Sequence, residues 1–308
     1  MDLPADFPST LTAFEDRFSD EETCRDYLAK MRWPEGFFCP ACSGRTGWRL
    51  AGRELFECAA CGRQTSLTAG TVFHGTRKPL RVWFRAMFLM MAQKNGMSAK
   101  SLQRLMGFGS YQTAWTWLHK LRRAIARRPR TELTGSVEAD DAYIGGPVEG
   151  CTGRGTTKPA VAVAVERRGT GMGRVRIEPV EDVSQPSLFT FVVNNVQRGS
   201  EVITDGLVSY AELPDAGYRH RPRAIGADPK RAAKLLPRVH RAISLFKRWV
   251  LGTHQGSASN KHLRAYCDEY EFRFNRRNSG HRVKLFHRLM EVAVATPPPT
   301  FRQLVAAT

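Results

Sequence analysis

Residues 137–146, VEADDAYIGG, combine an apolar strand pattern with three acidic side chains and end in two glycines. Acids are unusual in such a strand, because the chain holds only 29 Asp and Glu against 47 Lys and Arg. A second stretch, VITDG at 202–206, places Asp205 at the carboxyl end of another apolar strand. A lone Asp more often serves a turn or a salt bridge. Asp140 and Asp205 together, 65 residues apart, can meet on one face of a mixed sheet and bind a divalent metal for phosphoryl transfer.

The segments around these acids predict an α/β domain, because short apolar strands are followed by a helix and then by another strand. We expect strands at 136–145, 159–166 and 174–180, a helix at 184–196 and a strand at 201–204. Helices are expected further on at 207–213, 232–250, 260–276 and 283–294. The run Pro297-Pro298-Pro299 predicts a loose tail.

Length and charge limit the classes of protein that the chain can represent. At 308 residues it has room for about two domains of roughly 150 residues each. Its 42% hydrophobic and 25% charged residues are near globular averages, which excludes wholesale disorder. The net charge of +18 predicts a polyanionic partner, of which nucleic acid is the leading one.

The sequence predicts neither a membrane span nor an export signal. The longest uninterrupted apolar run, Ala86 to Ala92, has seven residues, whereas a membrane helix needs about 20. The start Met1-Asp2-Leu3-Pro4 lacks the basic and apolar regions of a signal peptide, so we expect a cytoplasmic protein.

Four of the seven cysteines form two tight pairs, Cys39 with Cys42 and Cys58 with Cys61, separated by fifteen residues. Two C-x2-C pairs at this separation predict a four-cysteine zinc ribbon. The alternative, buried thiols or two disulfides, is disfavoured because paired spacing in a cytosolic chain favours metal. The Zn²⁺ would be structural, since four thiolates leave no open position for a reacting water.

The rest of the N-terminal half has mainly helical patterns. Ser19 and Glu22 predict a capping box within a helical region over 10–33. Strands are expected at 48–50 and 54–57, and helices at 79–94, 98–106 and 111–127.

The last two of these helices are typical of a helix-turn-helix, with Gln112 and Thr113 where a recognition helix presents side chains to a DNA groove. Arg81, Arg122 and Arg123 flank the motif and supply the cations that phosphate contacts need. A plain helical hairpin packed on the ribbon is the structural alternative.

Two later stretches complete a larger pattern, LPRVHRAISLFKRWVLGTHQ at 236–255 and YCDEYEFRFNRR at 266–277. Together with VEADDAYIGG, VITDG, the cysteine pairs and YQTAW at 111–115, they resemble the ISXO-two-like group of bacterial insertion-sequence transposases. The resemblance covers residues 8 to 290 approximately. It implies a zinc ribbon followed by an RNase H-like catalytic domain of the DDE superfamily, a mixed sheet with flanking helices.

The family resemblance implies that Asp140 and Asp205 are catalytic, with a third position seven residues before a Lys on a late helix. In this chain these two positions are His240 and Lys247. Seven residues span about 700°, roughly 20° short of two helical turns, so both side chains lie on one helix face. The wider superfamily has Glu at the third position, although His is similar to what this group shows.

The role of His240 stays open at the level of sequence. Mg²⁺ prefers oxygen ligands, so the imidazole either ligates the metal or contacts the scissile phosphate or the attacking water. Lys247 suits a phosphate contact near the DNA end. Glu138, Asp141 and Glu269 are the alternatives for a third carboxylate.

The resemblance implies a transposase that binds terminal inverted repeats, cleaves double-stranded DNA with Mg²⁺ or Mn²⁺, and joins the freed 3′-hydroxyls to target DNA. Arg276 and Arg277 in the C-terminal basic stretch would hold the DNA backbone. Pairing two DNA ends implies a homodimer on DNA, in the bacterial nucleoid. The alternative is a non-catalytic zinc-ribbon DNA-binding regulator, or a decayed transposase.

The expected domain order follows the motifs along the chain. A helical segment at 1–35 precedes a four-cysteine zinc ribbon at 36–75 and a helical DNA-binding region at 76–130. The RNase H-like catalytic domain is expected at 131–295 and a tail at 296–308.

Overall fold

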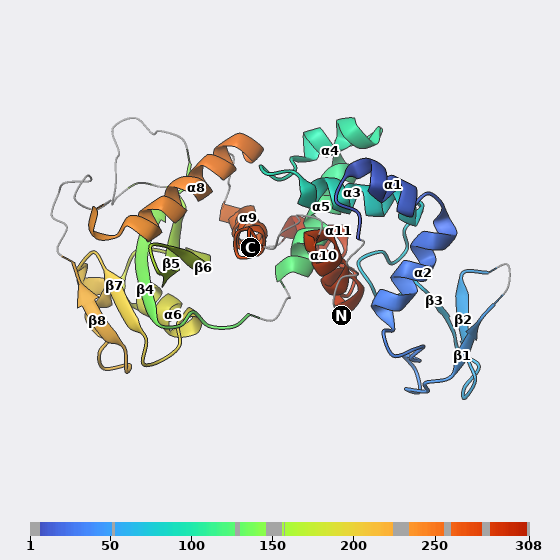
Figure 1. The fold of residues 1–308 in the computed structure, drawn as a ribbon, viewed down its shortest axis with the longest axis horizontal. Helices are drawn as coiled ribbons and strands as arrows, with labels where there is room; N and C mark the ends of the chain where they lie inside the picture. The colour runs from blue at the N-terminus through green and yellow to red at the C-terminus, as the bar shows by residue number, and fades with distance from the viewer. Residues whose placement is uncertain are drawn as a thin grey trace. The chain divides into compact units, whose positions relative to one another are not determined.

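The chain divides into two compact units, both drawn in Figure 1. The helical unit comprises Met1–Arg128 with Ser279–Val305, and the sheet unit comprises Pro129–Asn278 with Ala306–Thr308. The computed structural model describes residues 7–50, 53–126, 130–145, 156, 158–223, 234–255, 260–278 and 284–306. None of the helices in these ranges combines the length and the apolar character that crossing a membrane requires.

The helical unit is built around an aromatic core. Its helices are α1 (Leu11–Arg17), α2 (Glu21–Arg32), α3 (Leu80–Ala92), α4 (Ala99–Met106), α5 (Tyr111–Ala126), α10 (Lys284–Ala295) and α11 (Phe301–Ala306). The Phe14 ring centroid lies 4.8 Å from that of Phe18 and 4.9 Å from that of Phe286. Such ring pairs stabilise beyond their buried area, so the N-terminal segment and α10 share one core.

The helical region predicted over 10–33 is two helices, and its predicted capping box is wrong. Asp20, rather than Ser19, caps α2: its Oδ1 accepts a hydrogen bond of 2.7 Å from the backbone N–H of Thr23. Glu22 does not reach back to a cap residue, because its carboxylate instead accepts hydrogen bonds from Arg25 and Arg49. The Asp carboxylate satisfies the free amides of the first turn and fixes the break between α1 and α2.

Helix α10 groups with the helical unit, whereas the sequence-based division places 279–295 in the catalytic domain. It packs against α2, α3 and α5, and the Tyr27 hydroxyl lies 2.7 Å from Nδ1 of His287. Its apolar face, which includes Leu289 and Met290, is buried there. The predicted loose tail also contains a helix, α11, with Leu304 buried.

The cysteine-containing segment is a three-stranded antiparallel ribbon, one strand more than the sequence predicts. Its strands are β1 (Gly47–Arg49), β2 (Leu55–Cys58) and β3 (Gln64–Ser66), in that order. Gly47 is required for close packing, since a Cβ there would lie 2.5 Å from the Phe37 ring. The unpredicted β3 is short and polar, which leaves no alternating apolar signal in the sequence.

The sheet unit contains a five-stranded mixed sheet of order β6-β5-β4-β7-β8. Strands β4 (Ser136–Tyr143), β5 (Ala160–Arg168) and β6 (Gly171–Val180) are antiparallel, while β7 (Glu201–Thr204) pairs parallel to β4 and β8 (Arg219–Pro222) pairs parallel to β7. Helix α6 (Gln185–Asn195) covers one face of the sheet (Figure 1). Helices α8 (Pro237–His254) and α9 (Asn260–Phe274) pack with the sheet side chains in the hydrophobic core of the other face. The predicted RNase H-like mixed sheet with flanking helices is confirmed.

Alternation along β4 decides which side chains reach which face. Val137 and Ala139 pack in the core under α6, whereas Ala142 and Ile144 pack in the core under α8. Asp140 has the parity of Ala142, so it lies on the α8 face. The helix predicted at 207–213 is only a three-residue turn of 3₁₀ helix, η1 (Val208–Tyr210).

Candidate active site

Asp140 lies in the middle of the central strand, beneath helix α8. The residue is only 8% exposed, and its Oδ2 is 3.4 Å from Nε2 of His240. Its Oδ1 accepts a 2.9 Å hydrogen bond from the backbone N–H of Asp141. The fold therefore brings together two of the sequence-predicted residues, one from β4 and one from α8.

Asp205 lies level with Asp140 because β4 and β7 pair in parallel. Glu138 is the register partner of Ile203, so Asp140 and Asp205, each two residues further on, occupy the same level. Gly206, with φ of 84°, turns the chain directly after the strand. In that turn Asp205 Oδ1 accepts a 3.0 Å hydrogen bond from the backbone N–H of Leu207.

The site concentrates negative charge in a poorly solvated place. Burial, followed by the charges of Asp141 and Asp205, raises the pKa of Asp140 to about 8. Burial lowers the pKa of His240, which keeps the imidazole neutral at pH 7. Burial and the charge of Lys158 lower the pKa of Lys247. A site with these properties favours an added cation next to the carboxylates.

Glu138 anchors helix α8 over the acidic pair. It is 1% exposed, and its Oε2 accepts hydrogen bonds from the backbone N–H groups of Arg238 (2.7 Å) and Val239 (3.0 Å). Its Oε1 accepts a third bond of 3.0 Å from the Arg238 guanidinium. Helix α8 has no side-chain cap of its own, so the Glu138 carboxylate caps its first turn. This cap also fixes the position of His240, which lies two residues after Arg238.

The three alternatives for a third carboxylate do not take the place of His240. Glu138 is committed to the start of α8. Asp141 has the opposite strand parity to Asp140. Glu269 is fully buried on α9, with an oxygen 3.9 Å from Arg273, and α9 packs along β6 rather than β4. The residue that faces Asp140 is therefore a histidine.

Two buried polar atoms near the acids have no hydrogen-bond partner within the described part of the chain: Nε2 of His240 and the hydroxyl of Tyr210. Unpaired buried atoms are costly, and the carboxylate pair near them offers the oxygen ligands that Mg²⁺ prefers. This donor set fits a hydrated divalent cation. Of the described residues, however, only the four cysteines form a group of three or more ligand atoms all within 4.8 Å.

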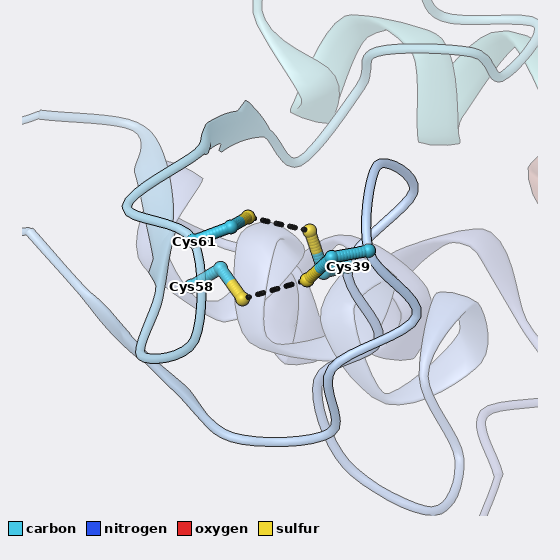
Figure 2. A group of neighbouring side chains, drawn as sticks. Cys39, Cys58 and Cys61 are labelled. Carbon is cyan, nitrogen blue, oxygen red and sulfur yellow. Dashed lines mark hydrogen bonds between the residues drawn. The ribbon is translucent and has the colours of Figure 1, made fainter.

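The cysteine cluster has the geometry of a tetrahedral metal site. Cys39 Sγ lies 3.7 Å from Cys61 Sγ (Figure 2), and Cys42 Sγ lies 3.6 Å from Cys58 Sγ. Four sulfurs about 2.3 Å from a central Zn²⁺ would be about 3.8 Å apart, whereas a disulfide would require about 2 Å. Backbone N–H groups of Cys42 and Ala41 lower the pKa of Cys39 to about 6, which favours the thiolate that zinc needs.

Helices α4 and α5 place the predicted recognition residues on an open surface. Gly107 ends α4 in a left-handed conformation with φ of 62°. Gln112 is exposed and Thr113 is half-buried at the start of α5. Arg123, near the end of α5, is exposed as well.

Arg122 is the exception among the predicted DNA contacts. It is only 2% exposed, and its guanidinium donates a 3.4 Å hydrogen bond to the carbonyl oxygen of Met97. The assignment of Arg122 to the DNA surface is therefore wrong, because neighbouring positions on a helix point in different directions and position 122 faces the core.

The other predicted DNA contacts already make bonds within the protein. Arg81 is exposed and donates to the carbonyl oxygen of Ser19. Arg276 is half-buried over the Phe272 ring, and Arg277 is exposed and donates to the Gly173 carbonyl oxygen.

Three residues of the site were missed from sequence: Glu138 as an anchor, Tyr210 and Lys158. Strand alternation could have found Glu138, since it has the same parity as Asp140. Tyr210 gives no signal, because its place depends on the turn after β7. Lys158 comes just before β5, whose end Ala160 pairs with Tyr143 beside the acids.

A mixed sheet of this order, with acids on adjacent strands and a polar partner on the facing helix, is typical of DDE-type nucleases and transposases. Family models match the chain in two places: the ISXO2-like transposase domain at residues 132–275 and the transposase zinc-ribbon domain at residues 19–64. The chain belongs to the ISXO2-like insertion-sequence transposases.

The chain is also similar to individual proteins. A protein of the transposable element ISH50 from Halobacterium salinarum is 26% identical over 273 residues, covering 81% of this chain and 90% of the relative. A crystal structure of the Mos1 mariner paired end complex with Mn is 12% identical, with a TM-score of 0.28, and covers 69% of this chain and 75% of that chain.

Proposed function

We propose that the sheet unit cuts DNA at the ends of its insertion sequence and joins the freed strands to target DNA. The observation that carries this proposal is the meeting of Asp140, Asp205 and His240, with His240 Nε2 3.4 Å from Asp140 Oδ2. In the first step a water oxygen attacks the scissile phosphorus and the bond to the 3′-oxygen breaks, leaving a 3′-hydroxyl. In the second step that hydroxyl attacks a target phosphodiester and displaces its 3′-oxygen.

The protein's own groups hold the reacting atoms in this scheme. Asp140 and Asp205 would hold Mg²⁺ or Mn²⁺, which when bound activates the attacking oxygen and stabilises the leaving oxygen. Burial lowers the pKa of His240 and favours the neutral ring, and in the tautomer with the proton on Nδ1 its Nε2 accepts a hydrogen bond from the attacking hydroxyl beside Asp140. Lys247, which lies on the same face of α8 as His240, donates a hydrogen bond to a non-bridging phosphate oxygen.

The helical unit would select the DNA on which this chemistry acts. One Zn²⁺ on the four cysteines stabilises the ribbon, and the start of α5 enters the major groove of the terminal inverted repeat. Exposed Gln112 is placed to read a base edge, while Arg81 and Arg123 contact phosphates. Two copies of the chain would hold the two element ends in a homodimer on DNA.

End-labelled element termini, incubated with the purified chain and Mg²⁺ or Mn²⁺, test the proposal. We expect cleavage by the parent, loss of cleavage but not of binding in Asp140→Asn and Asp205→Asn, and much weaker effects in Asp141→Asn. For His240→Ala we expect no turnover, and for His240→Glu partial activity because a carboxylate can serve the same metal. A parent that binds the termini and never cuts them would identify the chain as a regulator or a decayed transposase.

A further inference from the structure

A pocket of about 360 Å³ opens in the sheet unit, away from the acidic pair, beside the turn between β5 and β6 and the end of α9. Its lining includes Arg167, Arg168, Arg174, Arg277 and Glu166. Four guanidinium groups around one small cavity form a concentrated positive charge. The chemistry proposed above for Asp140, Asp205 and His240 uses none of these arginines.

The internal ion pair of this pocket neutralises only one of its four arginines. Arg174 Nε donates to Glu166 Oε2 at 3.0 Å, and backbone N–H groups of Thr134 and Arg174 also donate to that carboxylate. Although burial opposes ionisation, these hydrogen bonds lower the pKa of Glu166 and keep it charged. The residues that line the pocket therefore carry a net charge of +3, four arginines against one glutamate.

One wall of the pocket is built rigidly. The Arg277 guanidinium lies 4.0 Å from the Phe274 ring centroid and donates to the carbonyl oxygens of Phe274 (3.0 Å) and Gly173 (3.1 Å). Beside it, the Asn275 side chain both accepts from and donates to the backbone of Val175, which closes the free edge of β6.

Two of the β5 residues of the pocket are arginines with unused hydrogen-bonding capacity. The exposed Arg168 side chain makes no hydrogen bond or ion pair to any residue in the described ranges. Arg167 approaches a carboxylate only at 3.9 Å, and that carboxylate, Glu138, is already bonded to Arg238. Planar guanidinium forks match phosphate oxygens in pairs, so both arginines are suited to a phosphate group.

The distance from the acids suits one continuous DNA duplex. Asp140 is the register partner of Val163, and Arg167 lies four residues further along β5. At about 3.3 Å per residue this is roughly 13 Å, or about four base pairs of duplex rise. A duplex that runs along β5 with its scissile phosphate at Asp140 would therefore have backbone phosphates within reach of the pocket.

We propose that this arginine pocket binds a backbone phosphate of the DNA about four base pairs from the scissile phosphate. The inference rests on the proposed function for its choice of DNA as ligand. It assigns Arg168 and Arg167 as the phosphate contacts and Arg277 as the fixed wall.

The test measures binding of the full chain to a duplex of unrelated sequence by fluorescence anisotropy, at 50 to 200 mM salt. For Arg168→Ala we expect the slope of log affinity against log salt to fall by about 0.9, the value for one lost phosphate contact. If the contact contributes nothing to DNA affinity at 1 M salt, that change in slope corresponds to an affinity about 15-fold lower at 50 mM salt and about fourfold lower at 200 mM. Arg168→Lys, which keeps the charge without the fork, should lose less.

Arg219→Ala is the matched control, since Arg219 is exposed on β8 at the opposite edge of the same sheet. It should leave the slope unchanged. An unchanged slope in Arg168→Ala, or an equal loss of DNA affinity in both variants, overturns the proposal that the pocket binds a DNA phosphate. Protection of the β5–β6 turn from hydrogen exchange by inorganic phosphate and not by duplex also overturns it, because that result describes a small-anion site. The proposed function is tested separately by cleavage of element termini: a chain that shows the slope change but never cuts retains the pocket and loses the transposase activity.

Discussion

Replacing Asp140 by Asn should stabilise the sheet unit in the absence of metal, by an amount that grows with pH. The pKa of Asp140 is raised from 3.8 to about 8 because the carboxyl is buried and because the charges of Asp141 and Asp205 oppose its ionisation. Between these two pH values the folded state binds the proton more tightly than the unfolded state does. Stability is therefore lost as pH rises through this window. Asn cannot ionise, and its side-chain oxygen can still accept the hydrogen bond from the backbone of Asp141.

The size of the effect follows from the two pKa values. With 3.8 in the unfolded chain and about 8 in the folded one, ionisation destabilises the parent by roughly 2 kcal/mol at pH 5 and roughly 6 kcal/mol at pH 9. The stability difference between Asp140→Asn and the parent should thus widen by roughly 4 kcal/mol between those pH values. This is a large fraction of the stability of an ordinary domain.

Hydrogen exchange of β4 and β5, corrected for the intrinsic rate at each pH, measures this difference in the sheet unit alone. Trp249 is the only tryptophan of residues 129–278, so whole-chain fluorescence would mainly report the helical unit. Asp215→Asn is the matched control, because Asp215 is exposed in a turn of the same unit. It should show no pH-dependent difference from the parent.

Divalent metal supplies the second half of the test. Millimolar Mg²⁺ at pH 9 should protect the parent and leave Asp140→Asn unchanged, because binding to the native state alone stabilises it. The reasoning is refuted if the two proteins differ by the same amount at pH 5 and pH 9. It is also refuted if Mg²⁺ protects both proteins equally, since the cation would then bind elsewhere.

Four further predictions concern the rest of the molecule. The parent should hold one Zn²⁺ per chain, and Cys58→Ser should lose the metal and the ribbon's protection from hydrogen exchange; a zinc-free parent by metal analysis would contradict the site. Glu138→Gln should destabilise the sheet unit by about 3 kcal/mol and lower the rate of end cleavage more than DNA affinity, and an unaffected rate would show that α8 does not depend on this anchor. Arg122→Ala should destabilise the helical unit by about 2 kcal/mol and leave the slope of log DNA affinity against log salt unchanged. Arg123→Ala should lower that slope by about 1 without destabilising the unit. Calorimetry measures the stability of each variant, and binding at several salt concentrations measures the slope. Gln112→Ala should lose about 1–3 kcal/mol of discrimination between terminal and unrelated sequences in competition binding, and retained preference would move recognition to the ribbon.

The features of the site that the sequence predicts are those fixed by local spacing. Two C-x2-C pairs can bring four sulfurs together because each tight turn positions two of them, and the sulfur distances of 3.6 and 3.7 Å agree with this. The strand alternation around Asp140 and the helical spacing of His240 and Lys247 are local in the same way. Periodicity therefore predicts the face on which each of these residues lies.

The features that the sequence does not predict depend on partners far along the chain. Strands β3 and β8 are three- and four-residue elements with polar sequences, and they are strands only because a neighbour supplies the hydrogen bonds. Helix α10 has an amphipathic pattern that any apolar core could cover, so its membership of the helical unit has no local signature. The burial of Arg122 and the exposure of Arg123 likewise depend on which face of α5 the rest of that unit covers.

The presence of His240 in place of a carboxylate is consistent with the electrostatics of its surroundings. Asp140 already shares its field with Asp141 and Asp205, and these charges together with burial hold its pKa at about 8. A further carboxylate 3.4 Å away, where Nε2 of His240 lies, would add repulsion that the fold must overcome before any metal binds. A neutral imidazole avoids that cost and still offers a lone pair or a proton at the same position. Because Glu138 fixes the start of α8 through three hydrogen bonds, the imidazole stays at that position without a charge of its own to attract it to Asp140.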